Sequence, residues 1–236
     1  MSTAIAIPEI KELPTTAKAA AEFIWRNQDL LNAISHPRGM GTIEMGKRLS
    51  EVDRRAVIRD YELALISEIN ELQENFYWKH WSAEAKAGKR WQLLHPEKES
   101  GEGTAQNVCL EITDLLFFTV SLLQVKGYTE SGWVEFWGNE SQWNLKGDGA
   151  RSLSRPEDAQ ALLECGLDLI AATRSNYSAY PPEAAVLLAM YSFAGITWEK
   201  ALSLYAQKLI KNYERQARGR KQVGDEMAAT ENAGIR

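Results

Sequence analysis

Two pairs of acidic residues, each inside a stretch that otherwise has the pattern of an apolar helix, constrain this chain more than any other feature. The pairs are Glu68-x-x-Glu71 and Glu111-x-x-Asp114. Residues three positions apart lie about 60° apart around a helix, so each pair presents both carboxylates on one face. On both helices that face is also the apolar one, which carries Tyr61, Leu65 and Leu72 in the first stretch and Leu115, Phe118 and Leu122 in the second.

Burying these four carboxylates without a partner would cost more free energy than the net stability of a domain. The sequence therefore predicts a cation between the two helices. Carboxylate oxygens favour Mg²⁺ or Mn²⁺ over zinc, so we expect a magnesium site that manganese can also occupy. The alternative is an ordinary solvated acidic surface, which the apolar neighbours of the acids oppose.

The composition narrows the class of protein. The 236 residues, 44% of them hydrophobic and 25% charged, suit one large domain or a domain with a subdomain. A net charge of −5 gives no support to binding of a nucleic-acid polymer, although a small anionic substrate remains compatible if a metal supplies positive charge. Only Cys109 and Cys165 are present, too few for a disulfide framework. We expect a cytoplasmic protein.

No membrane partner is expected from the sequence. The first 13 residues have neither a basic leader nor a sustained apolar run, and we expect no stretch to be long and apolar enough for a membrane span.

Helical periodicity dominates, which predicts an all-α helical bundle with the metal site between the two acidic helices. The expected organisation is an extended segment over residues 1–14, a single all-α domain over 15–219 and a flexible tail over 220–236. Within the domain we expect helices over about 15–35, 50–81, 104–127, from 154 onward, 182–194 and 197–218. The connecting segments are a turn-rich loop over 36–46, a loop or lid over 82–103 and an irregular or short-helical insertion over 128–154.

Polar residues on two other helical faces are candidates for substrate binding. Gln28 and Asn32 lie one turn apart, and Lys208, Asn212 and Arg215 share a face of the last helix; a solvated face is the alternative in both cases.

The remaining motifs are less informative. Lys79 would lie on the Glu68 side if the second helix continued past Trp78, where it could meet phosphate or simply extend into solvent. The segment 41–47 has the glycine and lysine spacing of a phosphate loop, but Arg48 stands where a Ser or Thr is needed and no strand precedes it, so we reject that interpretation. The tryptophans of the insertion are expected to fill a core or a dimer interface.

Four pieces, in this order, resemble the dimeric all-α dUTP pyrophosphatases (dUTPases), part of a larger all-α nucleotide pyrophosphohydrolase superfamily. They are Gln28-x-x-Leu31-Asn32, Glu68-x-x-Glu71 with Trp78-Lys79-His80-Trp81, Glu111-x-x-Asp114 with Phe118, and Lys208-x-x-x-Asn212-x-x-Arg215-Gln216-x-x-Gly219. The chain departs from the family where Asp and Tyr commonly follow in the last motif, because Ala217 and Arg220 stand there.

The resemblance implies Mg²⁺-dependent hydrolysis of dUTP to dUMP and pyrophosphate by a homodimer. It also implies roles for individual residues. Glu68, Glu71, Glu111 and Asp114 would bind the metal. Gln28 and Asn32 would face the pyrimidine. Lys208, Asn212 and Arg215, with Lys79 as a further candidate, would bind the phosphates. We assign catalysis to Glu71 and Glu68, with Glu71 as the group that takes the proton of the attacking water.

Three alternatives stay open at this stage. The enzyme could act on dCTP or several deoxynucleoside triphosphates, because a rotated amide would accept cytosine. A helical interaction or sensor protein without turnover is the second. A di-iron bundle is the third, opposed by the absence of any Glu three residues before His36, His80 or His95.

Overall fold

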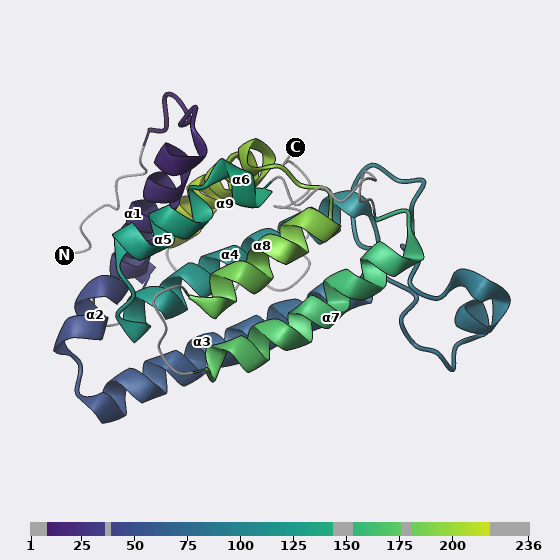
Figure 1. Ribbon diagram of the computed structural model, residues 1–236, viewed down its shortest axis with the longest axis horizontal. Coiled ribbons are helices and arrows are strands. Elements are labelled where there is room, and N and C mark those ends of the chain that lie inside the picture. Colours follow the sequence, from purple (N-terminus) through teal and green to yellow (C-terminus); the bar gives the residue numbers. More distant parts are fainter. Residues whose placement is uncertain (1–8, 36–38, 144–152, 176–180, 218–236) are drawn as a thin grey trace.

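The computed structural model describes residues 9–35, 39–143, 153–175 and 181–217, and every regular element in these ranges is a helix (Figure 1). The prediction of an all-α fold is therefore confirmed. The helices, in chain order, are α1 (Ala17–Ser35), α2 (Thr42–Arg48), α3 (Glu51–Glu74), the π-helical turn η1 (Ala85–Lys89), α4 (Ala105–Lys126), α5 (Glu130–Trp137), α6 (Glu140–Trp143), α7 (Pro156–Thr173), α8 (Pro182–Phe193) and α9 (Trp198–Ala217). Most of the expected extended segment and all of the expected tail lie outside the described residues.

Several helix ends follow from side-chain capping. The Ser50 hydroxyl accepts a hydrogen bond from the Asp53 backbone N–H at 3.1 Å, and Thr104 does the same for Asn107 at 3.2 Å. Gly127 ends α4 in the left-handed conformation, with φ of 90°. The helices predicted to begin at Ser50 and Thr104 are thus found at those places.

Helix α4 is the central element, because it packs against α1, α2, α3, α8 and α9. Contact on all sides explains why nearly every residue from Leu110 to Val125 is apolar or buried. By length and composition α4 would also pass as a membrane span, so the expectation that no stretch is long enough was wrong. However, 83% of its apolar window is buried inside the protein, as expected of a core helix.

Helix α3 ends at Glu74, about two turns earlier than expected. Its last turn is closed by Asn75, whose side chain accepts hydrogen bonds from the Gly103 N–H at 2.8 Å and from Asn107 at 3.0 Å. The chain then pairs with a later segment through Tyr77 and Gln92, whose backbone bond measures 3.0 Å. These non-local bonds satisfy the backbone polar groups, so α3 does not continue. Residues 76–104 instead form the mostly irregular segment, containing η1, that projects at the right of Figure 1.

Helix α2 lies within the segment expected to be a loop, of which residues 36–38 are outside the described part. The Asp29 carboxylate accepts a bond from the Ile43 backbone N–H at 2.8 Å and so caps the helix from another element. A Cβ at Gly41 would lie 2.5 Å from this carboxylate, so only glycine allows the approach. A cap supplied by a distant residue leaves no local pattern in the sequence.

The expected insertion contains two short helices, α5 and α6, and its residues 144–152 lie outside the described part. Trp133 and Trp137 are buried and stack at 4.7 Å between ring centroids, while Trp143 is half-buried. These aromatic residues fill the core, one of the two places expected for them. The helix expected from Ser154 begins at Pro156, and no side chain caps it.

Candidate active site

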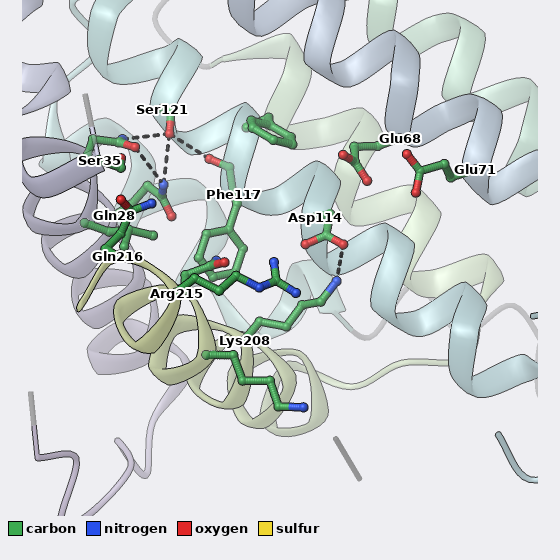
Figure 2. Close-up of a pocket in the computed structure, with 15 residues that line it drawn as sticks. Gln28, Ser35, Glu68, Glu71, Asp114, Phe117, Ser121, Lys208, Arg215 and Gln216 are labelled. Carbon is green, nitrogen blue, oxygen red and sulfur yellow. Dashed lines mark hydrogen bonds and ion pairs between the residues drawn. The ribbon is translucent and has the colours of Figure 1, made fainter. Parts of the chain in front are cut away.

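The packing of α3 against α4 brings the two acidic pairs together. Glu68, Glu71 and Glu111 each present a carboxylate oxygen, and these oxygens all lie within 4.8 Å of one another. Asp114, one turn after Glu111, faces the same region (Figure 2). The sequence-predicted acids therefore form one cluster at the interface of two helices.

This cluster carries more negative charge than its surroundings favour. Burial, followed by the nearby carboxylates of Asp114 and Glu71, raises the pKa of Glu68 to about 9. Burial and the charge of Asp114 raise the pKa of Glu111 to about 7, and burial also raises that of Glu71. Additional positive charge at this position would thus lower the electrostatic free energy of the cluster.

Part of the expected positive charge comes from a lysine. The ammonium of Lys208, on α9, pairs with the Asp114 carboxylate and donates to the Leu110 carbonyl at 3.0 Å. Lys208 is only 6% exposed, so its charge acts in a poorly solvated region and lowers the pKa values of Glu68 and Glu111. The cation predicted between the acidic helices is therefore supplied in part by the protein itself.

A pocket of about 350 Å³ is lined at one end by three of the four acids, Glu68, Glu71 and Asp114. Figure 2 shows Glu68, Glu71 and Asp114 at one end and Gln28 and Ser121 at the other, with the Lys208 and Arg215 side chains between them. The lining residues are Gln28, Leu31, Asn32, Ser35, Glu68, Glu71, Asp114, Phe117, Phe118, Ser121, Lys208, Lys211, Asn212, Arg215 and Gln216. Residues of four separate sequence motifs thus meet at a single cavity.

The end of the pocket away from the acids is built from buried amides. Gln28 and Asn32 are 2% and 6% exposed, so they do not form a solvated stripe. Both donate to the Ser121 hydroxyl, at 3.0 and 2.8 Å, and Gln28 also donates to the Asn32 side-chain oxygen at 3.3 Å. Polar groups held this way in a buried wall are suited to recognising a ligand by hydrogen bonds.

Lys79 does not line this pocket. It is exposed, with its ammonium 5.6 Å from the centre of the Trp78 ring. The extrapolation along α3 that would place Lys79 beside Glu68 fails because the helix has already ended at Glu74.

Several residues of the site were not singled out from the sequence. Ser121 lies two turns after Asp114 on the same face of α4, and Asn107 lies one turn before Glu111, to which it donates a hydrogen bond at 3.0 Å. Helical spacing from the acidic pair would have found both. Thr42, which accepts a hydrogen bond from Asn32 behind the pocket, has no such signal because its position depends on where α2 packs.

The acidic cluster fits a hard divalent cation. Its three closest ligand groups are all carboxylates, the donors that Mg²⁺ and Mn²⁺ prefer. The raised pKa values of Glu68 and Glu111 mean that protonation of these carboxylates competes with binding of a cation. The pocket dimensions suit a ligand of nucleotide size, since small-molecule sites begin at about 300 Å³.

Comparison with known proteins identifies a family. A family model described as dUTPase matches residues 40–219, which is more than half of the chain. The matched range includes both acidic pairs and the α9 residues of the pocket, and it begins after α1, which carries Gln28 and Asn32. No curated protein matches the sequence.

Proposed function

This chain belongs to the all-α dUTPase family, and from that premise we propose that it hydrolyses dUTP to dUMP and pyrophosphate in the pocket between α1, α3, α4 and α9, with Mg²⁺ bound at the acidic cluster. One observation carries the proposal. The same cavity has carboxylates at one end, cationic side chains in the middle and buried amides at the other end. A nucleoside triphosphate has the matching order of groups.

In this proposal Glu68, Glu71, Glu111 and Asp114 bind the metal, for which Mn²⁺ is an acceptable substitute. Bound Mg²⁺ would neutralise triphosphate charge and polarise the phosphoryl oxygens. Asn107, through its bond to Glu111, holds one of the four carboxylates in position.

The protein side chains act on both the water and the phosphates. Glu71 is the most exposed of the four acids, and its raised pKa makes it a suitable proton acceptor for an attacking water. The water oxygen bonds to the α-phosphorus, the bond from that phosphorus to the bridging oxygen breaks, and pyrophosphate leaves. Lys208 and Arg215, with the Asn212 amide, offset the charge of the phosphates.

We also infer a homodimer, as the family resemblance implies. Leu63 and Ile66 on α3 and Leu167 on α7 are 58%, 37% and 65% exposed, and these two helices pack against each other. Exposed apolar side chains on neighbouring helices suit a protein contact. Analytical ultracentrifugation tests this: Leu167→Glu should shift the wild-type dimer towards monomer, whereas an unchanged dimer would place the interface elsewhere.

The substrate assignment is tested with a panel of deoxynucleoside and ribonucleoside triphosphates in Mg²⁺. We expect the highest kcat/KM for dUTP, and more than about 100-fold loss in Glu111→Gln with an unchanged helical circular dichroism spectrum, because a ligand should matter more than its supporting residues. Equal turnover of dCTP or of all deoxynucleotides would replace the dUTP assignment with a broader one, and no turnover of any nucleotide would favour an interaction or sensor protein.

The two ends of the pocket should respond differently to substitution. Asn32→Ala should reduce kcat/KM for dUTP by roughly 5- to 150-fold, the equivalent of about 1 to 3 kcal/mol for an unpaired polar group, and reduce preference among bases. Lys208→Ala should weaken every triphosphate similarly, since phosphate contacts do not depend on the base. The opposite pattern, with base preference altered only by Lys208→Ala, would contradict this division.

A further inference from the structure

A buried hydrogen-bond relay behind the pocket fixes the orientation of the Gln28 and Asn32 amides. Thr42 on α2 and Gln124 on α4 are 0% and 1% exposed, and neither lines the pocket. Asn32 donates to the Thr42 hydroxyl at 3.1 Å, and Thr42 donates to the Gln124 side-chain oxygen. The relay therefore runs from the pocket wall to residues that cannot touch a ligand.

The direction of the hydrogen bonds in this relay is set by the Gln124 side-chain oxygen, which can accept a hydrogen bond but cannot donate one. The Gln124 side-chain nitrogen donates to the backbone carbonyl of Trp25 at 2.7 Å, which turns its oxygen towards Thr42. The other neighbour of the Thr42 hydroxyl is an Asp29 carboxylate oxygen at 3.3 Å, also an acceptor. Since Thr42 must give its one hydrogen to an acceptor, it can only accept from Asn32. The Asn32 nitrogen must therefore face Thr42.

Ser121 imposes the same direction independently. Its hydroxyl donates to the Phe117 carbonyl at 2.8 Å, so its oxygen is left to accept from the nitrogens of both amides. The Gln28 nitrogen, which also donates to the Asn32 oxygen, thereby uses both of its hydrogens, and so does the Asn32 nitrogen. The Gln28 oxygen shares the single hydrogen of the Tyr205 hydroxyl with the Ile24 carbonyl, each at 3.2 Å.

The unused hydrogen-bonding capacity of the two amides is therefore acceptor capacity. Each amide oxygen has two lone pairs and accepts one bond within the protein, whereas no N–H of either amide remains. A ring edge that presents an N–H, such as the imide N3–H of uracil, is complementary to such a wall. The N3 of cytosine presents a lone pair instead, which would face an oxygen lone pair.

Building on the proposed dUTP hydrolysis, we propose that Thr42 and Gln124 are positioning residues for base selection: they hold Gln28 and Asn32 with their oxygens available to the base, and so favour an imide N–H over the N3 of cytosine. Neither residue touches the nucleotide. Their effect passes through the orientation of Asn32, because the bond to Thr42 adds to the cost of rotating this amide to suit cytosine.

The test compares Thr42→Val with Thr42→Ser, measuring kcat and KM for dUTP and dCTP in saturating Mg²⁺. Valine keeps the shape of threonine and removes the hydroxyl, so Asn32 keeps only its bonds with Ser121 and Gln28 to oppose rotation. We expect the dUTP to dCTP ratio of kcat/KM to fall by about tenfold or more in Thr42→Val, mainly through KM, and to be retained in Thr42→Ser. An unchanged ratio in Thr42→Val, with turnover intact, would overturn the proposal.

A measurement on the wild-type protein keeps the test independent of whether Thr42→Val folds. Both dCTP and N3-methylated dUTP lack the N3–H, so each should have a kcat/KM about tenfold or more below that of dUTP. Comparable turnover of dUTP and dCTP by wild type would overturn the inference that the two amides present hydrogen-bond acceptors to the base, while leaving dUTP hydrolysis established. Failure to hydrolyse dUTP at all would instead overturn the proposed function, and this inference with it.

Discussion

Asn107 links the acidic cluster to the end of α3. Its side-chain nitrogen donates to Glu111 and to Asn75, each at 3.0 Å, and thus uses both hydrogens. Asn75 in turn is held by the Gly103 N–H. A carboxylate fixed in this way loses little further freedom when it binds a cation, so the bond prepares Glu111 for that role.

Asn107→Ala should therefore reduce the affinity for Mg²⁺ more than it reduces the free energy of unfolding. We expect about 10- to 100-fold loss in apparent Mg²⁺ affinity, the usual effect of removing a group that orients a metal ligand, measured as the Mg²⁺ dependence of dUTP turnover.

Gln160→Ala serves as the matched control, since Gln160 is an exposed amide on α7 whose side chain donates a hydrogen bond to Glu164, one turn along the same helix, at 2.8 Å. Equal Mg²⁺ dependence in the two variants would show that Asn107 does not prepare the site.

Among the helices, α2 contains most of the segment 41–47, whose interpretation as a phosphate loop was rejected from the sequence. Packing gives another reason for a glycine in this segment. Gly46 belongs to the segment with phosphate-loop spacing. In the structure a Cβ at this position would lie 2.7 Å from the Gln124 carbonyl oxygen and 2.9 Å from that of Val125. The glycine therefore allows α2 to approach the end of α4, and so brings Thr42 within reach of the pocket amides.

Gly46→Ala should destabilise the protein by about 1 to 3 kcal/mol, because the added methyl group would meet backbone atoms that cannot move aside. The free energy of unfolding in urea measures this. Lys47→Ala, at the exposed neighbouring position, should change it by no more than about 0.5 kcal/mol. Equal stability of Gly46→Ala and wild type would mean that α2 can move away from α4 freely.

The elements that could be predicted from the sequence are those with local signals. The acidic pairs marked α3 and α4, Thr104 and Gly127 marked the ends of α4, and Pro182 marked the start of α8. The end of α3, the existence of α2 and the position of Lys79 could not be predicted, because each depends on hydrogen bonds to residues distant in the chain, such as those from Gly103 to Asn75 and from Ile43 to Asp29.

The same distinction applies to the candidate site. Residues on the acidic helix faces and on α9 were found by helical spacing, and the structure brings them to one pocket. The polarity of the Gln28 and Asn32 amides could not be predicted, since it is set by Ser121 on α4 and Thr42 on α2, which only tertiary packing brings near these amides.

For the whole molecule, the crowded acids make stability depend on pH. In the unfolded chain Glu68 and Glu111 titrate near 4.5, whereas in the folded protein their pKa values are about 9 and about 7. Between these values the folded state binds more protons than the unfolded state, so the free energy of unfolding decreases as pH rises. Without divalent metal, the protein should be more stable at pH 5.5 than at about pH 8.5 on this account.

Thermal unfolding in excess chelator across this range measures the effect. Mg²⁺ should raise the Tm by mass action, and more at high pH than at low pH, because deprotonated carboxylates bind the metal. The double variant Glu68→Gln, Glu111→Gln is the control and should show a flatter pH profile with little response to Mg²⁺. A wild-type Tm that rises with pH in chelator would contradict the assigned electrostatics.

The central claim is that this pocket joins a metal-binding acidic cluster to a nucleotide site that breaks the bond at the α-phosphorus. Phosphorus NMR of dUTP turnover, with Mg²⁺ and with excess chelator, tests it most directly. The account predicts dUMP and pyrophosphate in equal amounts from the first turnovers, with no turnover in chelator. Orthophosphate as the first product with dUDP accumulating, or full activity in chelator, would contradict it.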